Sequence, residues 1–307
     1  MPHPIALDCG SGGTRIWRCV NGAMQRQPWP GGGRAPVLSS CLSSPDRREE
    51  FAAGVLALGE PCFIGATAGL RHALEQGAVT EADVAALRGL LPGSELRVLT
   101  PLEEAEYELR ALRKCYPTDA MCAMISMGGK SMQCGREGHL FSVPFAMHLG
   151  YGLFQASLAK GPSRGGQPWS QLVTEVADVY KTRCAEAVER QGLQPITGTL
   201  MGVTDLVDMA RPLGMLNCPP MSVESLLERL GTCVQGYTDR AHGSEGLERG
   251  ELVLLARALA LSAVAAQLFD PSGLLLSQQG STQLGRMIFQ SGKGIIALLL
   301  SQLSGAD

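Results

Sequence analysis

The sequence PIALDCGSGGTRIW, from Pro4 to Trp17, contains the pattern from which the rest of the chain is interpreted. Ile5–Leu7 is a short apolar run typical of a buried strand, and the run ends at Asp8. A glycine-rich turn follows at Gly10–Gly13, and extended-type residues resume at Thr14. We therefore predict a strand, an acidic residue, a glycine-rich turn and a second strand.

This turn is a candidate anion site. Glycine lets main-chain N–H groups crowd around an anion, and Ser11 and Thr14 add hydroxyl donors. Such a hairpin can cradle a phosphate, and Asp8 at its entrance can hold a hydrated divalent cation through water. The alternative is an ordinary tight β-hairpin in which Asp8 caps the turn.

Length and composition indicate a globular protein of two lobes. The chain has 307 residues, of which 45% are hydrophobic and 18% charged, and it exceeds the usual single-domain length of about 100–200 residues. The net charge is −3, and the basic residues are scattered, so nothing indicates nucleic-acid binding. Any anion site must therefore be local.

The cysteines and the apolar segments favour a cytoplasmic protein. None of the 10 cysteines forms a CxxC pair, and several lie in apolar runs that suit buried, reduced thiols. The N-terminus lacks the basic start and long apolar core of a signal peptide. The apolar segment Leu252–Phe269 contains Arg257 and Gln267 and falls short of a bilayer span of about 20 apolar residues, so we predict a buried helix and no membrane partner.

Strand and helix patterns alternate along the chain, which indicates an α/β fold. Pro28–Pro45 is expected to be a surface loop, and a strand at Pro61–Ile64 leads into a helix at Thr67. This strand-to-helix step directs a hydroxyl and free backbone N–H groups to one place. Further helices are expected at Arg47–Leu58, Thr80–Leu91, Pro101–Cys115, Pro168–Gln191 and Ser222–Ala241, and a terminal helix after a strand at Leu274–Leu276.

The helix from Pro101 has three glutamates in its first turns. The helix dipole favours acids at this end, which suffices to explain Glu103 and Glu106. Glu104 is not assigned to this role alone, and it remains a candidate catalytic carboxylate.

A second strand–turn–strand pattern, MISMGGKSMQ, occurs at Met124–Gln133. When the sequence is aligned with itself at an offset of 118 residues, Gly10 aligns with Gly128 and Asp8 with Ser126. Two similar lobes, residues 1–118 and 119–307, would each open with a phosphate-binding hairpin, and both turns would meet at a shared cleft. The terminal helix is a candidate to pack back on the first lobe.

The motifs, in this order along the chain, resemble those of the apyrases, the nucleoside triphosphate diphosphohydrolases. The matching segments are Asp8–Arg15, Gly65–Arg71, Glu103–Ala105, Gly128–Gln133 and Leu149–Gly152. The total length and the second half, with an expected turn at Gly198–Gly202, are more similar to the related exopolyphosphatases and guanosine pentaphosphatases. Both families have the two-lobed actin-like (ribonuclease H-like) ATPase fold, so the resemblance implies a nucleotide or polyphosphate substrate bound between the lobes.

The resemblance also implies roles for individual residues. Glu104 would activate the attacking water, Asp8 would organise a hydrated Mg²⁺ or Ca²⁺, and Gln133 would lie near the metal shell. Thr67 and Arg71 match a loop beside the water. The phosphate-binding turns match Ser11, Gly12, Gly13 and Thr14 in the first hairpin, and Gly128, Gly129, Lys130 and Ser131 in the second.

The chain departs from these families at several positions. Ser126 replaces a second metal-organising aspartate, and Lys130 replaces a small residue and can neutralise phosphate as a point charge. Thr282–Gly285 lacks the Arg-Glu pair of the polyphosphatases. Tyr237 is the only candidate in the second half for stacking a base, and the favoured alternative is that it is a core or surface residue.

The leading functional hypothesis is metal-assisted hydrolysis of the terminal phosphoanhydride of nucleoside tri- or diphosphates by a Glu104-activated water. One alternative is an exopolyphosphatase or guanosine pentaphosphate phosphohydrolase. Another, motivated by Ser126, is a nucleotide-binding relative with weak or lost hydrolysis. A third is an unrelated α/β protein with accidental glycine-rich turns. The sequence does not indicate an oligomeric state.

Overall fold

The structure is a computed structural model that describes residues 5–20, 23–115, 123–159, 168–197, 199–204, 209, 221–241, 247–270 and 275–276. The chain divides into two compact units, with the change between them at Pro117–Thr118. The terminal helix expected after Thr282 lies outside the described residues.

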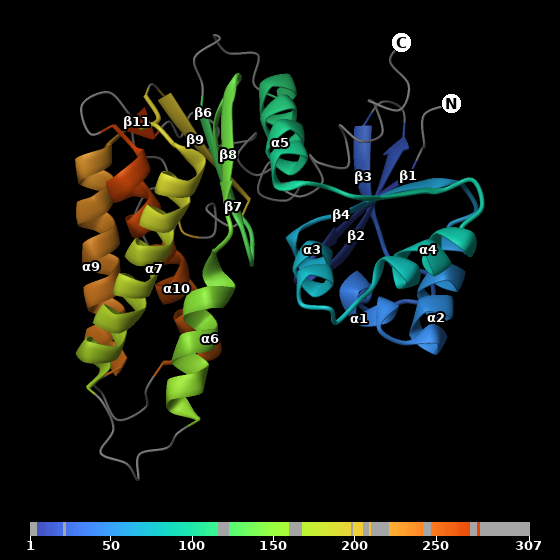
Figure 1. The fold of residues 1–307 in the computed structure, drawn as a ribbon, viewed down its shortest axis with the longest axis horizontal. Helices are drawn as coiled ribbons and strands as arrows, with labels where there is room; N and C mark the ends of the chain where they lie inside the picture. Colours follow the sequence, from blue (N-terminus) through green and yellow to red (C-terminus); the bar gives the residue numbers. More distant parts are fainter. Residues whose placement is uncertain are drawn as a thin grey trace. The chain divides into compact units, whose positions relative to one another are not determined.

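The first unit is built on a sheet of five described strands with the order β3-β2-β1-β4-β5 (Figure 1). The strands β1, β2 and β3 form consecutive antiparallel hairpins, and β4 and β5 continue the sheet in parallel from β1. Because β1 is central, all six of its residues are buried. The strand bounds are β1 Ile5–Gly10, β2 Gly13–Val20, β3 Ala23–Gln27, β4 Cys62–Ala66 and β5 Glu95–Val98.

Helices cover one face of this sheet. Ile5 and Leu7 of β1 and Ile64 of β4 pack into a core with apolar residues of the first four helices. The fifth helix, α5, begins directly after β5, and its bounds agree with the prediction. The helix bounds are α1 Leu38–Leu42, α2 Pro45–Leu56, α3 Ala68–Glu75, α4 Glu81–Gly89 and α5 Pro101–Cys115.

One prediction in this unit is wrong, because the segment expected to be a surface loop contains α1. Leu38, Cys41 and Leu42 are buried in the core of the first unit, and this burial supports a short helix that the local Pro, Gly and Ser content does not indicate. The segment before α1 also contributes Trp29, whose ring packs on Phe51 of α2 with centroids 5.4 Å apart.

The second unit has six described strands in the order β10-β11-β9-β6-β7-β8. Its antiparallel hairpins β6-β7 and β7-β8 and its parallel pairs β6-β9 and β9-β11 reproduce the β1-β2, β2-β3, β1-β4 and β4-β5 pairings of the first unit. The α/β prediction is therefore confirmed. The bounds are β6 Ala123–Met127, β7 Met132–Arg136, β8 His139–Val143, β9 Thr199–Thr204, β10 Met221–Ser222 and β11 Leu275–Leu276.

The pairing register of the two hairpins is the same after a shift of 118 residues. Asp8 lies opposite Arg15 in β1-β2, and Ser126 lies opposite Gln133 in β6-β7. The segment at Gly198–Gly202, expected to be a turn, instead supplies the start of strand β9 at Thr199.

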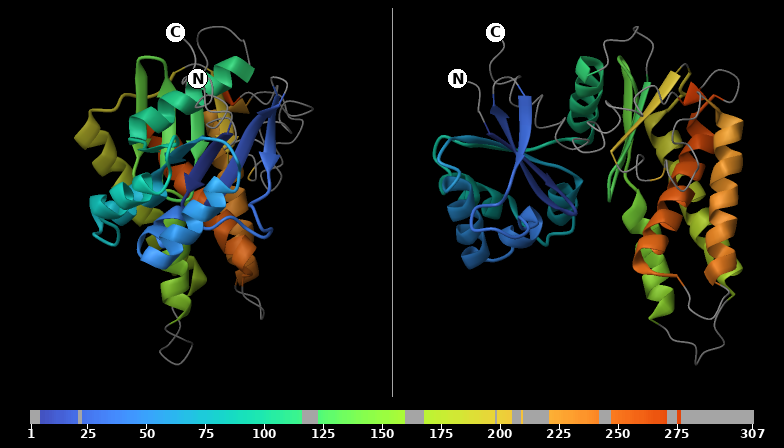
Figure 2. Two further views of the ribbon diagram at one scale, coloured as in Figure 1. Left: turned by 90° about the vertical axis from the view of Figure 1, so that its right-hand side faces the viewer. Right: turned by 180° about the vertical axis from the view of Figure 1, so that it is seen from behind.

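Three described helices, α6, α7 and α9, pack around α10 in the second unit (Figures 1 and 2). Among the helices described, α10 alone is long and apolar enough to cross a membrane, with a mean hydropathy of 1.6, but 67% of that window is buried inside the protein. The prediction of a buried helix here is confirmed. The bounds are α6 Met147–Leu158, α7 Trp169–Gln191, α9 Val223–Ala241 and α10 Arg249–Leu268.

The contact between Trp29 and α2 generates a test of packing. A Cβ atom on Gly54 would lie 2.2 Å from Trp29 Cζ2, so Gly54→Ala should displace the indole and lower the free energy of unfolding by about 1–3 kcal/mol. Gly89→Ala in α4 is the matched control, because a Cβ there meets nothing within 4 Å. Urea unfolding of both variants measures the difference, and equal stabilities would contradict the packing.

Candidate functional site

The carboxyl ends of the parallel strands β1, β4 and β5 meet at one edge of the first sheet. Asp8 of β1 lies opposite Gly65 of β4, and Gly65 lies opposite Arg97 of β5. The three strands lead respectively into the first glycine-rich turn, into Thr67 and into the start of α5. This edge is the usual position of ligand sites in parallel sheets. It brings together all the site residues predicted in the first unit.

The first turn is packed tightly against the start of α3. The Thr67 backbone N–H donates to the Cys9 carbonyl at 3.2 Å, and the Thr67 hydroxyl lies 3.5 Å from the same oxygen. A Cβ on Gly69 would lie 2.8 Å from Ser11 Cα and 2.9 Å from Ser11 N, so only glycine permits this approach. The conformation of the turn therefore depends on α3.

Thr14 does not place its hydroxyl as predicted. The Thr14 hydroxyl donates to the Pro36 carbonyl at 2.7 Å and also lies 3.6 Å from Cys9 Sγ. Because a hydroxyl has a single proton, which the Pro36 carbonyl accepts in this structure, Thr14 ties the turn to the segment before α1. Ser11 and Gly12 lie partly exposed at the tip of the turn.

Asp8 is 2% exposed, and its Oδ2 lies 3.6 Å from Nη1 of Arg15. No group of three or more His, Cys, Asp or Glu side chains within the described ranges forms a cage for a metal ion. A single buried carboxylate fits Mg²⁺ bound mainly by water and substrate phosphates, since Mg²⁺ usually keeps several waters and needs only one or two carboxylates.

Glu104 is buried and held in place by Arg71. The side chain of Arg71 donates to Glu104 Oε2 at 2.8 Å through Nη2 and to the Leu99 carbonyl at 2.6 Å through Nη1. Glu104 itself is 7% exposed. Arg71 thus joins α3, the end of β5 and the first turn of α5, and it orients the carboxylate.

The other early glutamates of α5 have structural roles, as the sequence predicts. Glu103 forms a capping box with Thr100, whose backbone N–H donates to Glu103 Oε2 at 2.7 Å and whose hydroxyl accepts from Glu103 N at 3.2 Å. The backbone hydrogen bond from Thr100 lowers the pKa of Glu103. Glu106 is exposed and lies 3.8 Å from Arg110.

The second hairpin contains a buried neutral network where the first has an ion pair. Gln133 is 1% exposed and donates from Nε2 to Ser131 Oγ at 2.8 Å and to Ser142 Oγ at 3.4 Å. Ser126, opposite Gln133, is also 1% exposed. Because the amide nitrogen is engaged with serines, only the carbonyl oxygen of Gln133 remains suited to a metal or its waters.

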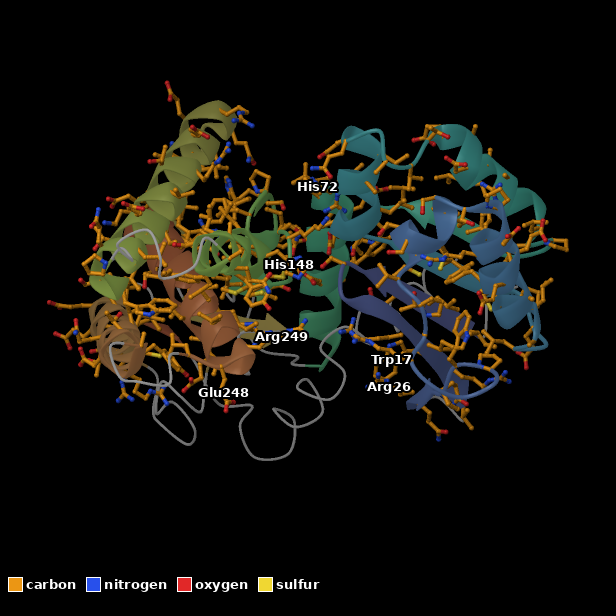
Figure 3. The ribbon with its side chains drawn as sticks, turned by 90° about the horizontal axis from the view of Figure 1, so that it is seen from below. Trp17, Arg26, His72, His148, Glu248 and Arg249 are labelled. Carbon is orange, nitrogen blue, oxygen red and sulfur yellow. The ribbon has the colours of Figure 1, made fainter. Side chains whose placement is uncertain are left out.

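Helix α6 and Tyr180 fix the second turn. Its backbone is closed by a hydrogen bond from Gly128 N to Ser131 O at 3.0 Å, and Gly129 O accepts from the backbone of His148 in α6 at 2.8 Å. The Tyr180 hydroxyl, buried in the core, accepts from Gly150 N and donates to Ala146 O, both at 2.8 Å. Lys130 is half-buried in this turn, and Figure 3 shows His148 on the adjoining helix.

Sequence reasoning missed Arg34 as a neighbour of the first turn. Its guanidinium donates to the Gly12 carbonyl, and its Nε would lie 3.5 Å from a Cβ on Gly13. Arg34 belongs to the segment expected to be an exposed loop, and no local motif marks it. The Thr14–Pro36 hydrogen bond holds this segment against the turn, and such a tertiary contact cannot be recognised from the local sequence.

The chain was compared with known proteins. No family model matches it, and no curated protein matches it in sequence. Solved structures do match. The Aquifex aeolicus member of the Ppx/GppA family has a TM-score of 0.55 and 15% identity, and the match covers 94% of this chain and 97% of that one. The type II variant of the Aquifex aeolicus Ppx/GppA phosphatase has a TM-score of 0.55 and 13% identity, and the match covers 94% of this chain and 99% of that one.

An exopolyphosphatase from Cytophaga hutchinsonii has a TM-score of 0.52 and 12% identity, and the match covers 92% of this chain and 96% of that one. At such identities the likeness establishes the fold, which is the predicted two-lobed actin-like ATPase fold. The three structures carry names of the second family that the sequence resembles, and none of the three is named an apyrase.

The contact between Gly69 and Ser11 predicts that Gly69→Ala deforms the first turn. Affinity for inorganic phosphate or tripolyphosphate should fall by about tenfold or more, because the turn must move to admit the Cβ. Titration calorimetry measures the affinity, and Gly152→Ala in α6, where a Cβ meets nothing within 4 Å, is the control. Unchanged affinity in Gly69→Ala would show that the turn does not bind the anion.

The shared register of the hairpins predicts a specific coupling between positions 126 and 133. Ser126→Asp alone buries a carboxylate opposite Gln133 and should destabilise the protein by about 3–5 kcal/mol. Adding Gln133→Arg reproduces the Asp8–Arg15 pair and should recover about 1–3 kcal/mol as coupling energy. Urea unfolding of the parent, both single variants and the double variant gives this energy, and strictly additive effects would disprove the equivalence of the two positions.

Proposed function

We propose that this chain hydrolyses the terminal phosphoanhydride bond of a polyphosphate chain. The observation that carries the proposal is the Glu104 carboxylate, which is 7% exposed and held at 2.8 Å by Arg71 on the same sheet edge as a glycine-rich turn. A fixed carboxylate beside a phosphate-binding turn is the arrangement that in-line attack by water requires.

In the proposed reaction, Glu104 accepts a proton from the attacking water as the water oxygen bonds to the terminal phosphorus. The bond between that phosphorus and the bridging oxygen breaks, and the shortened chain leaves with the electron pair. The Arg71 guanidinium orients Glu104 through Nη2, while its Nη1 donates to the Leu99 carbonyl. The products are inorganic phosphate and a chain one phosphate shorter.

The turns bind and neutralise phosphate oxygens in this proposal. The first turn offers the Ser11 hydroxyl and the backbone N–H groups of Gly12 and Gly13. The second turn offers Gly129 and the ammonium group of Lys130. Asp8 would hold Mg²⁺ or Ca²⁺ through water, and the cation would supply further charge neutralisation.

Two observations favour polyphosphate over a nucleoside phosphate as the substrate. The solved structures of similar fold include proteins named exopolyphosphatase and Ppx/GppA phosphatase. Tyr237, the candidate for stacking a base, is only 6% exposed, and the Arg240 guanidinium lies 4.6 Å from its ring centroid. Inorganic polyphosphate or a guanosine pentaphosphate-type chain is therefore the proposed substrate class.

A second candidate function is binding of the same anions with little turnover. The buried neutral pair Ser126–Gln133 favours it, because a carboxylate that would help to organise a cation is replaced by a hydroxyl. The two candidates share their ligand and differ in whether phosphate is released.

The proposed function predicts that Glu104→Gln lowers kcat for phosphate release by about 10²–10⁴-fold, because the amide cannot accept the proton. The measurement is phosphate release from tripolyphosphate, longer polyphosphate and nucleoside triphosphates with Mg²⁺ or Ca²⁺. Glu103→Gln, at the capping position one residue earlier, should retain activity.

Equal rates for the parent and Glu104→Gln would rule out Glu104 as the base. A parent protein that binds these anions tightly but releases no phosphate would establish the second candidate function.

A further inference from the structure

Beside the first turn lies a hollow of about 330 Å³ lined by three arginines and no acidic residue. It is bounded by the Gly12–Ile16 segment, by the end of β3 and by the returning segment Pro28–Ala35. We call it the arginine pocket, after Arg15, Arg26 and Arg34. In a chain with a net charge of −3, such a concentration of positive charge indicates an anionic ligand.

Two of these arginines are not engaged by acids. Arg15 is paired with Asp8 at 3.6 Å, but within the described part of the chain neither Arg26 nor Arg34 forms an ion pair. Arg26 is exposed and lies opposite Trp17 in the β2-β3 register, which places it on the same sheet face as Arg15; Figure 3 shows Arg26 beside Trp17. The pocket therefore presents guanidinium groups from two adjacent strands.

Arg34 joins the pocket to the phosphate turn. Its guanidinium donates to the Gly12 carbonyl and lines the hollow at the same time. Gly69 of α3 lies close against the turn at Ser11. A phosphate on the turn would thus have Arg34 as its neighbour on the open side.

We propose that the arginine pocket binds the phosphates of the substrate chain that follow the one held by the first turn. This inference rests on the proposed function and specifies its substrate as an inorganic oligophosphate segment. Guanidinium forks match phosphate oxygens in two-point hydrogen bonds, and successive phosphates repeat that geometry. Trp29 also lines the hollow, but its ring packs on Phe51 and over Gly54, so the indole is a wall of the pocket.

The test uses full-length protein carrying Glu104→Gln, so that the ligand is not consumed. Calorimetry with Mg²⁺ present measures the affinity for inorganic phosphate, tripolyphosphate and ATP. Arg26→Ala and Arg34→Ala should each weaken tripolyphosphate binding by about 10- to 100-fold. Arg26→Ala should change the affinity for inorganic phosphate by no more than about twofold, because inorganic phosphate binds only to the turn. The exposed Arg47 of α2 lies outside the pocket, and Arg47→Ala is the matched control.

Several results would overturn the assignment. Unchanged tripolyphosphate affinity in both Arg26→Ala and Arg34→Ala would exclude the pocket, and so would tripolyphosphate binding no tighter than phosphate binding. ATP binding more tightly than tripolyphosphate, with the excess lost in Arg26→Ala, would assign the pocket to a base. Arg34 contacts the turn backbone, so Arg26→Ala, at an exposed side chain, keeps the test independent of folding.

The proposed role of the pocket and the proposed hydrolysis can be refuted independently of each other. A parent protein that binds tripolyphosphate through Arg26 but releases no phosphate refutes hydrolysis and supports the pocket. A parent protein that hydrolyses polyphosphate through Glu104 but is insensitive to Arg26→Ala supports hydrolysis and refutes the pocket.

Discussion

The parallel pairing of β1 with β4 is the constraint on which the candidate site depends. It sets Asp8 opposite Gly65, so the chain leaves both strands at the same edge and Thr67 reaches the Cys9 carbonyl. Parallel pairing of β4 with β5 brings the start of α5 to that edge as well, where Arg71 can link Leu99 and Glu104. Asp8 and Glu104, which are far apart in the sequence, thus reach the same sheet edge through strand pairing, and the Arg71 side chain fixes Glu104 there.

The second unit repeats the scaffold with different chemistry. Its hairpin keeps the register of the first, but the Asp8–Arg15 pair becomes Ser126–Gln133, and the turn is held by serines and by α6. The Asp8–Arg15 pair holds its charges 3.6 Å apart with no hydrogen bond between them, whereas Gln133 is hydrogen-bonded to two serines, so the two hairpins compensate their buried polar groups in different ways. The asymmetry concentrates the acidic groups of the candidate site in the first unit, where Asp8 and Glu104 lie at one sheet edge.

Much of this architecture could be predicted because its signals are local. The run from Ile5 to Asp8, the helical pattern at Thr80–Leu91 and the 118-residue offset can all be recognised in the sequence, and the strands and helices follow them. Arg34 and α1 could not be predicted, because their positions depend on tertiary packing of a segment that reads as loop. The same holds for Thr14, whose hydroxyl is committed to Pro36 by the return of that segment. The families suggested by resemblance shared the fold, and motif spacing alone could not choose between their substrates.

Trp29 connects the arginine pocket to the hydrophobic core, and this has a thermodynamic consequence. The same indole lines the hollow and packs against Phe51 and Gly54, so the packing of α2 holds one wall of the pocket in place. A ligand that binds only the packed form shifts the folding equilibrium by mass action. An anion bound in the pocket, as proposed, would therefore stabilise the first unit against unfolding, and this stabilisation would rise with the anion concentration.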